Sequence, residues 1–435
     1  MIGEWTTGRL GDCVRLQSGG TPSKSRTDFW TGDIPWVSAK DMKSYWIEDS
    51  EDHLSEAGVN AAARIVERGT TLLLVRGMTL HKDVPISRIR RPAAFNQDVK
   101  AALACSGTDP EFVPYLLLGN KAKILSIVDS AGHGTGRLNS DTLLNLPVRT
   151  PPIEEQRAIA HILGTLDDKI ELNRRMNETL EAMARAIFKS WFLDFDPVRA
   201  KAESRDPGLP AHIADLFPDS FEDSELGAIP GGWKVDTLGN LSQKPQYGYT
   251  ASANSEPVGP KFLRIADINK QAWIDWATVP FCEISAEDYE KYKTLVGDIL
   301  IARMADPGHG VMVEEEVDAV LASYLIRFKL RDAEYSRYMQ YWLRSEAYWE
   351  LVTSRSAGTT RANLNAKVLS AFPLIVPSRA VASAFRRVSD SMRAKVVTNV
   401  DESRALAAIR DALLPKLLSG EVRVREAAEI VEDVV

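Results

Sequence analysis

The sequence predicts an α+β fold in which two similar mixed α/β domains alternate with two long helices packed against each other as a coiled coil. Two observations predict it. A stripe of seam positions runs without a break through the middle of the chain, and the same pattern returns in the second half. Together they indicate one architectural unit used twice, a pseudo-two-fold internal repeat.

The first long helix is predicted from Glu154 to Trp191. Alternate steps of four and three residues keep one narrow stripe facing a single partner helix. The stripe consists of Ile159, Leu163, Leu166, Ile170, Asn173, Asn177, Leu180, Ala184, Ile187 and Trp191. Pro151-Pro152 ends the preceding segment, and Glu154-Glu155 suits a helix N-terminus. A long amphipathic helix lying on an ordinary core is the alternative interpretation.

The partner helix is predicted in the same chain. Adding 226 to each seam position gives a second, mostly apolar stripe: Phe385, Ser389, Met392, Val396, Asn399, Ser403, Leu406, Arg410, Leu413 and Leu417. Upstream, Leu138-Asn139 recurs as Leu364-Asn365 at the same offset, whereas Trp5 recurs as Trp233 at an offset of 228. A small insertion or deletion explains the drift.

Each seam has an asparagine near its midpoint, Asn173 in the first helix and Asn399 in the second. Centred antiparallel pairing would bring the two close together, and a buried asparagine fixes the register at a cost in stability. We expect replacement of both by leucine to raise stability and loosen the register.

Proline clusters and changes in composition set the expected boundaries. These are a globular domain over residues 1–151, a helical spacer over 152–195, a linker over 196–232, a second globular domain over 233–377, a second helical spacer over 378–420 and an acidic tail over 421–435. Prolines from Pro207 to Pro230 indicate an extended linker. Pro415 should kink or end the second long helix, Gly420 is typical of a helix C-cap, and the tail after Val424 is expected to fray.

Length and composition limit the function classes. A chain of 435 residues suits two or three domains. It has no apolar run long enough to span a membrane and no secretory signal, and its three scattered cysteines indicate a reducing cytoplasm. No metal site is expected from six equally scattered histidines. The net charge of −7 for the whole chain argues against binding to nucleic acid, so a prediction of DNA binding depends on local features.

Motifs of catalytic sites are missing from the sequence. It has no phosphate-binding loop, dinucleotide fingerprint, zinc-protease helix or nucleophile elbow, so we predict no catalytic residue. Asp167-Asp168 forms a carboxylate pair, and its place on a polar helix face favours solvated surface over chemistry.

Two similar heads held apart by helices suggest a reader of a two-part target, and DNA half-sites about 34 Å apart offer a matching geometry. Candidate contacts are mainly basic and hydrogen-bonding side chains on loops. In the first domain they are Thr21, Trp36, Lys40, Arg76, Lys82, Arg88, Arg90, Arg91, His133, Thr135 and Arg137. In the second domain they are Tyr247, Tyr249, Thr250, Lys261, Arg264, Arg303, His309, Arg355, Thr359, Thr360 and Arg361.

For any single candidate, a surface salt bridge is the alternative interpretation. Two pairs are favoured because they occupy roughly equivalent places in the two repeats. Arg76 has Arg303 as its counterpart with a slip of one residue, and Arg137 has Arg361.

Several stretches are similar to one known family. They are Ser18 to Ser23, Gly32 to Val37, Pro152 to Ala160, Ser190 to Val198, Leu226 to Trp233 and Leu413 to Glu421. On these stretches the chain resembles the specificity subunit of type I restriction–modification systems over nearly its whole length. One departure is Pro377 to Ala382, which lacks the Pro-Pro-x-x-Glu-Gln opening of the first spacer and leaves the start of the second helix open.

The resemblance implies two target-recognition domains and two helical spacers packed as an antiparallel coiled coil. It also implies a subunit that is not an enzyme and holds no cofactor. It implies double-stranded DNA as a partner, together with methyltransferase subunits that use S-adenosylmethionine on adenine. It also implies restriction and translocase subunits that use ATP and Mg²⁺. Two alternatives stay open: a coiled-coil interaction scaffold without a DNA role, and the specificity part of a methylation-only or other restriction system.

Overall fold

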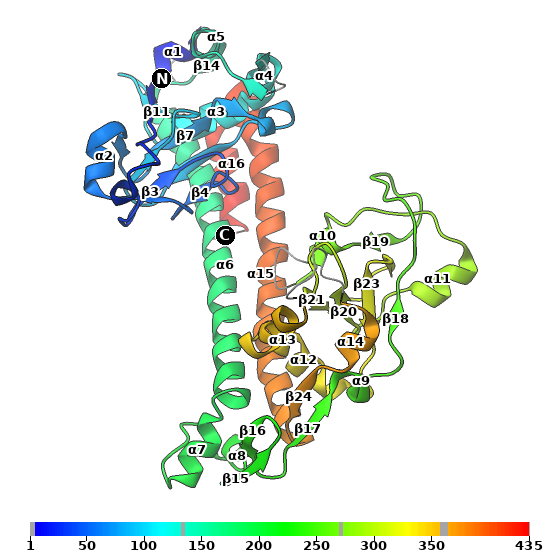
Figure 1. The fold of residues 1–435 in the computed structure, drawn as a ribbon. Coiled ribbons are helices and arrows are strands. Elements are labelled where there is room, and N and C mark those ends of the chain that lie inside the picture. The colour runs from blue at the N-terminus through cyan, green and yellow to red at the C-terminus, as the bar shows by residue number, and fades with distance from the viewer. Residues whose placement is uncertain (1–4, 132–134, 269–272, 357–363, 435) are drawn as a thin grey trace. The chain divides into compact units, whose positions relative to one another are not determined.

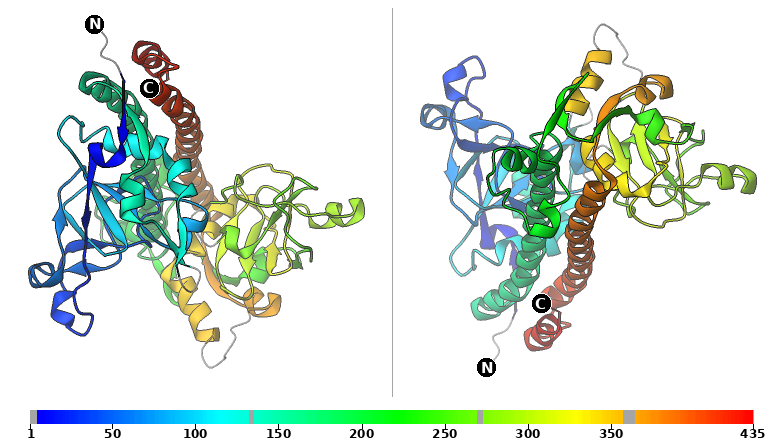
Figure 2. Two further views of the ribbon diagram at one scale, coloured as in Figure 1. Left: turned by 90° about the horizontal axis from the view of Figure 1, so that it is seen from above. Right: turned by 90° about the horizontal axis from the view of Figure 1, so that it is seen from below.

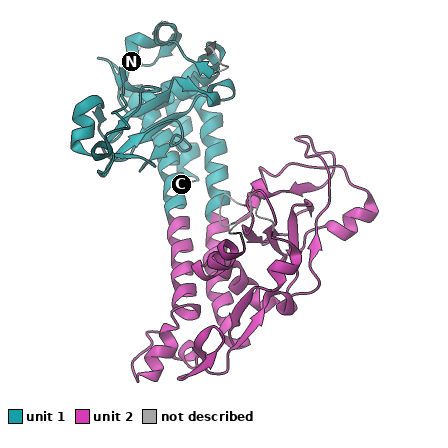
Figure 3. Ribbon diagram, viewed as in Figure 1, with its two compact units in different colours: residues 1–175, 399–435 teal, residues 176–398 magenta. Residues whose placement is uncertain are grey.

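The computed structural model describes residues 5–131, 135–268, 273–356 and 364–434. The chain divides into two compact units. Unit 1 comprises Met1–Arg175 and Asn399–Val435, and unit 2 comprises Met176–Thr398 (Figure 3). Among the described residues, no helix combines the length and the apolar character that a membrane crossing requires.

The two long helices are α6 (Ile153–Phe192) and α15 (Arg379–Ser419), of 40 and 41 residues. Each gives one half to unit 1 and the other half to unit 2, and within each unit the two halves lie side by side (Figures 1 and 3). The predicted α+β fold with two long packed helices is confirmed. The second helix begins at Arg379 although the first spacer's opening motif is missing there.

In unit 1 the helix halves run antiparallel, because Asp167 contacts Arg410 and Asn173 contacts Ser403. The expected seam positions are apolar and buried here: Ile159, Leu163, Leu166, Leu406 and Leu413, with Ile170 partly buried. The amide of Asn173 donates to the Glu402 carboxylate at 2.7 Å and to the Ser403 hydroxyl at 3.3 Å. These contacts lie about one helical turn from Asn399, the partner that we expected.

In unit 2 the helix halves meet through aromatic rings. Phe188, Trp191 and Phe192 of α6 lie 5.2 to 6.1 Å from the Phe385 ring of α15, measured between ring centroids. Val396 is buried in this half of α15, and Leu180, Ile187 and Met392 are partly buried. This end of the pair therefore depends on ring packing.

The globular part of unit 1 is built mainly from short strands and short helices. They are β1 (Thr6–Arg9), α1 (Leu10–Cys13), β2 (Val14–Ser18), β3 (Ile34–Val37), β4 (Trp46–Ile47), β5 (His53–Leu54), α2 (Glu56–Ala62), β6 (Ile65–Val66), β7 (Thr71–Leu74), β8 (Arg76–Gly77), β9 (Ile86–Ile89), β10 (Ala93–Phe95), β11 (Val99–Ala104), α3 (Val113–Gly119), α4 (Lys121–Ser126), β12 (Asp129–Ala131), β13 (Thr135–Arg137), α5 (Ser140–Leu144) and β14 (Pro147–Thr150). A five-stranded sheet of order β2-β11-β7-β9-β4 forms its centre. The strands lie beside the first half of α6 (Figures 1 and 2), and β7 is buried along its length in the core that includes Ile159 and Leu163.

The globular part of unit 2 repeats much of this plan. Its elements are α7 (Asp196–Ala202), α8 (Ala211–Ala214), β15 (Phe221–Ser224), β16 (Gly227–Pro230), β17 (Lys234–Thr237), α9 (Leu238–Leu241), β18 (Gln246–Tyr247), β19 (Lys261–Leu263), α10 (Ile265–Ile268), α11 (Ala286–Tyr292), β20 (Ile299–Ala302), β21 (Gly310–Met312), β22 (Ala319–Leu321), β23 (Leu325–Phe328), α12 (Ser336–Trp342), α13 (Glu346–Ser356), α14 (Ala366–Ser370) and β24 (Pro373–Val376). Its main sheet has the order β18-β23-β20-β21. The β17–β24 pair repeats the β1–β14 pair of unit 1.

Two local expectations are wrong, and of the two outcomes expected at Pro415, a kink or an end of the helix, the end does not occur. The stretch expected as an extended linker contains α7, α8 and the β15–β16 hairpin, and it buries Phe217 and Ile229 in the unit 2 core. The tail expected to fray forms α16 (Val424–Glu432), because Ala427 and Val431 pack into the unit 1 core. Pro415 does not end α15, which continues to Ser419. Gly420 then follows at φ +76°, as expected of a C-cap.

Backbone hydrogen bonds locate the drift between the repeats. Three N–H to carbonyl hydrogen bonds of unit 1 have a counterpart in unit 2. The bond from Leu10 to Leu146 matches the one from Leu238 to Phe372, and the bond from Cys105 to Cys13 matches the one from Arg331 to Leu241. The bond from Val75 to Asp98 matches the one from Arg303 to Tyr324. Residues up to Val75 therefore recur 228 positions later, and residues from Asp98 onward recur 226 later. Two residues are missing from unit 2 between these points.

This register corrects one expected equivalence. The carbonyl of Val75 accepts from the N–H of Leu138, and the carbonyl of Arg303 accepts from the N–H of Leu364. Arg303 therefore occupies the backbone position of Val75, one residue before that of Arg76. The expected equivalence of Arg76 and Arg303, which assumed an offset of one residue, was therefore wrong.

Candidate nucleic-acid interface

Two arginines of unit 1 lie opposite each other on neighbouring strands. In the β8–β13 pair, Arg76 is directly across from Arg137, and both side chains are exposed. Within the described part of the chain, neither guanidinium has an ion pair or a side-chain hydrogen bond. Because like charges directly opposite on a strand pair are destabilising, this arrangement indicates a place for an external anion.

The geometry of this strand pair depends on a glycine. A Cβ on Gly136 would come within 2.8 Å of the Leu80 side chain and 3.0 Å of the Gly77 carbonyl, so a larger residue would push β13 away from β8. Met78 nearby is 67% exposed and Lys82 is also exposed. The surface thus combines basic groups with an exposed apolar side chain.

The turn-rich run Ser18 to Ser23 lies close to this surface. The Thr21 hydroxyl donates to Gln97 at 2.5 Å, and Gln97 is followed by Asp98, whose carbonyl accepts from the N–H of Arg76. A Cβ on Gly20 would lie 1.8 Å from the Ala62 carbonyl, so this turn packs tightly against the rest of the unit. Thr21 and exposed Gln97 therefore extend the surface around Arg76.

The Trp36 and Arg88 side chains are both 4% exposed and turned inward, which argues against DNA contact. The Trp36 indole donates to the carbonyl of Gly20 at 2.9 Å, which fixes the turn. The Arg88 guanidinium donates to the Gly69 carbonyl and to Glu111, and it lies over the Trp46 ring. Both residues support the domain from inside.

Other basic candidates of unit 1 have acidic partners. Lys40 is 3.0 Å from both Glu51 and Asp52, and Arg91 is 2.7 Å from Asp49. Arg90 lies over the Trp46 ring at 4.1 Å and is 3.7 Å from Asp168. Their charge is partly neutralised within the domain, so they are weaker candidates than Arg76 and Arg137. Thr135 is half-buried in β13, and His133 lies outside the described residues.

Unit 1 also contains a buried polar network. Asp167, which we expected to be solvated, is 3% exposed and accepts from Tyr115 at 2.8 Å and from Arg410 at 2.6 Å. Burial raises the pKa of the Asp167 carboxyl, and Arg410 opposes that rise. The network ties the globular part of unit 1 to both long helices.

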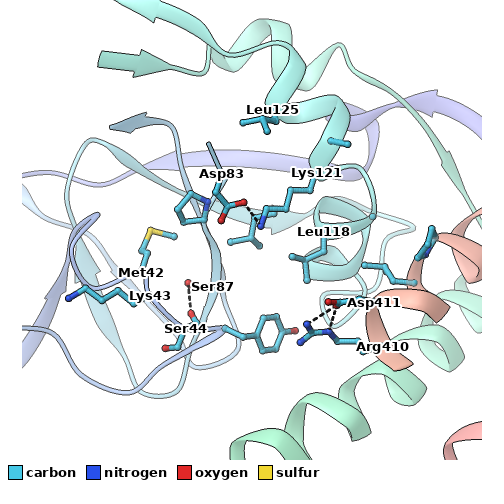
Figure 4. A pocket seen from close by; sticks show the side chains of 17 residues that line it. Met42, Lys43, Ser44, Asp83, Ser87, Leu118, Lys121, Leu125, Arg410 and Asp411 are labelled. Carbon is cyan, nitrogen blue, oxygen red and sulfur yellow. Dashed lines mark hydrogen bonds and ion pairs between the residues drawn. The ribbon is translucent and has the colours of Figure 1, made fainter. Parts of the chain in front are cut away.

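Arg410 also lines a cleft of 670 Å³ in unit 1 (Figure 4). The cleft lies between Met42 to Tyr45, helix α4 and the C-terminal part of α15. Four of its charged side chains form two pairs, since Lys121 is 2.6 Å from Asp83 and Arg410 is 2.7 Å from Asp411 (Figure 4). We therefore do not place the nucleic-acid contact there.

In unit 2 the central candidate is Arg303 at the end of β20. Its guanidinium carbon lies 5.2 Å from the ring centre of Tyr247 and 5.8 Å from that of Tyr324. Both rings are exposed, by 40% and 51%. Tyr324 could not be predicted from the sequence, because only the strand pairing places it across from Arg303.

The remaining candidates of unit 2 divide by their contacts. Arg264 forms a fork with Asp267, Lys261 donates to the Val279 carbonyl, and His309 lies 3.0 Å from Asp306. Thr250 and Arg355 are exposed, and Tyr249 is half-buried beside Tyr292. Thr359, Thr360 and Arg361 lie outside the described residues. In the described part of the chain, no three His, Cys, Asp or Glu side chains gather as a metal ion would require.

The model of one protein family, the type I restriction modification DNA specificity domain, matches residues 2–182. A specificity subunit of the type I restriction enzyme MjaIX from Methanocaldococcus jannaschii is 28% identical, over 97% of this chain and 94% of its own length. Over nearly its whole length this chain is similar to a type I restriction–modification specificity subunit.

Two further comparisons agree with this family. The HindI specificity subunit of Haemophilus influenzae is 27% identical, over 72% of this chain and 77% of its own length. The crystal structure of an S subunit from M. genitalium matches the fold with a TM-score of 0.57 at 15% identity, covering 96% of each chain.

Proposed function

We propose that this specificity subunit reads a bipartite, gapped DNA target, with each unit contacting one half. The observation that carries the proposal is the Arg76–Arg137 pair, two exposed cations across neighbouring strands without an acidic partner in the described residues. DNA phosphates would neutralise both charges, and arginine can also contact guanine in the major groove.

The catalytic steps belong to partner subunits in this proposal. A methyltransferase subunit modifies adenine with S-adenosylmethionine, and a restriction and translocase subunit uses ATP and Mg²⁺. The chain supplies the sequence specificity for both, in the cytoplasm, where its three free cysteines stay reduced. The long helices are the surface on which the partners dock.

A scaffold without a DNA role is not favoured. Such a protein would have no use for two like charges placed opposite each other at a cost in stability. A methylation-only system keeps the same role for this chain and differs only in whether a nuclease subunit is present.

The test is a map of adenine methylation across the genome of the source cell, with the gene intact and deleted. We expect one gapped, two-part motif to lose its methylation on deletion and to regain it when the gene is restored. Survival of every methylated motif, with the partner methyltransferase expressed and bound to the chain, would contradict the proposal.

A further inference from the structure

In unit 2 an arginine side chain lies between two exposed aromatic rings. The distances from Arg303 to Tyr247 and Tyr324 are within the range in which a ring face attracts a guanidinium. Contact with both ring faces restricts where the half-buried guanidinium can lie. We call these three residues the Arg303 clamp.

The backbone beneath the clamp is fixed on both sides. The N–H of Arg303 donates to the Tyr324 carbonyl at 3.0 Å, and the Arg303 carbonyl accepts from Leu364 at 2.9 Å. The Tyr247 hydroxyl accepts from the N–H of Ala366 at 3.0 Å, which holds this ring against the start of α14. The clamp is therefore formed before any ligand binds.

The charge of Arg303 is available to a ligand. Within the described residues, no carboxylate lies within ion-pair distance of it, and its buried Nε has no hydrogen-bond partner. Asp306, three residues away, lies 3.0 Å from His309. A guanidinium has five N–H donors in a fixed planar fork, so a ligand can still engage the donors at its outer edge.

We propose that the Arg303 clamp reads a guanine in the half of the target bound by unit 2. Arg303 donates to N7 and O6 of that guanine in the major groove, and Tyr247 and Tyr324 are positioning residues. The inference rests on the proposed DNA-recognition function. Bidentate contact needs a restrained guanidinium, which contact with two rings favours, whereas a phosphate accepts a donor from many directions.

The clamp distinguishes the two units. Val75 occupies the corresponding backbone position in unit 1, and Asp98 stands where unit 2 has Tyr324. We therefore expect this guanine contact in only one half of the target.

The test uses the full chain bound to its methyltransferase partner and a duplex that carries the mapped target. Each guanine is replaced in turn by 7-deazaguanine, which lacks the N7 acceptor. We expect one position, in one half, to lower the methylation kcat/KM by about tenfold or more. The Arg303→Met and Arg303→Ala variants, which lack a donor, should be insensitive to that replacement. Lys234→Ala, a change of an exposed cation on β17, should respond as the unchanged chain does.

Three results would overturn the inference. They are a target without guanine in either strand, equal kcat/KM for all 7-deazaguanine duplexes, and variants that keep the sensitivity of the unchanged chain. A uniform loss across sequences with a shallower salt dependence would assign Arg303 to a phosphate instead. The 7-deazaguanine experiment uses the unchanged chain, so it does not depend on the folding of any variant. A complex that methylates no DNA at all would contradict the proposed function, not only the guanine contact.

Discussion

The two units hold the same pair of helices together by different means. In unit 1 the contacts between helices include polar groups, with Asp167 paired to Arg410 and Asn173 bonded to Glu402 and Ser403. In unit 2 three aromatic rings of α6 surround Phe385 of α15. A repeat at the level of the fold has therefore kept its architecture while the interactions that stabilise it have diverged.

The largest expected effect on stability is in unit 2, where aromatic rings of α6 pack against Phe385 of α15. Phe385 is fully buried, and Phe385→Ala should lower the stability of unit 2 by about 3–5 kcal/mol, because it leaves a cavity among four rings. Hydrogen exchange measured by mass spectrometry should rise in peptides from 176–398. Equal acceleration of exchange in peptides from both units would show that the units unfold together. It would contradict the view that each unit is stabilised by its own interactions.

The buried ion pair of unit 1 is next in size. Arg410→Met should cost about 3 kcal/mol, because it leaves Asp167 buried without its cation. Exchange should accelerate in peptides from 153–175 and 399–419. Asp411→Asn, which changes the other, exposed partner of Arg410, is the control and should stay within about 0.5 kcal/mol.

The same variant should show a characteristic dependence on pH. Burial already raises the pKa of Asp167, and loss of Arg410 raises it further. A carboxyl with a raised pKa in the folded state contributes stability at acid pH that is lost as the pH rises through that pKa. Urea unfolding should therefore find Arg410→Met closer to the unchanged chain near about pH 5 than near about pH 8. A difference that is constant with pH would rule out Asp167 as the cause.

A smaller effect is expected at Asn173. Asn173→Leu removes the donor to Glu402 and should cost about 1–2 kcal/mol, because a hydrogen bond to a charged group is lost. This revises the expectation that leucine raises stability, since Asn173 bonds to a carboxylate. Thermal unfolding that is unchanged or shifted upward would restore the original expectation.

The smallest effect on stability is expected at the surface. Arg76→Ala and Arg137→Ala should each change stability by less than about 0.5 kcal/mol, and removing both repelling charges should not destabilise the fold. Each should lower the slope of log affinity against log salt by about one if it contacts a phosphate. Arg425→Ala, on the exposed face of α16, is the control. A double variant with unchanged DNA affinity would exclude this surface from the interface.

The candidate site was only partly predictable from sequence. Loop position and residue type selected Arg76 and Arg137, which are exposed, and Arg303, which is half-buried. The same criteria also selected Trp36 and Arg88, because a buried arginine with internal partners looks like an exposed one in sequence. Tyr324 was missed, since its place beside Arg303 depends on the pairing of β20 with β23.

The two long helices and the internal repeat could be predicted from the sequence alone, because seam periodicity and fixed-offset similarity are patterns of residue types along the chain. The antiparallel direction of the pairing is shown by contacts between the helices. Tertiary structure alone decided which polar groups are buried, as for Asp167, and that the tail folds into α16. It also decided the register that sets Arg303 at the position of Val75. Those outcomes depend on contacts between residues distant in sequence, and burial and partners are properties of the folded chain.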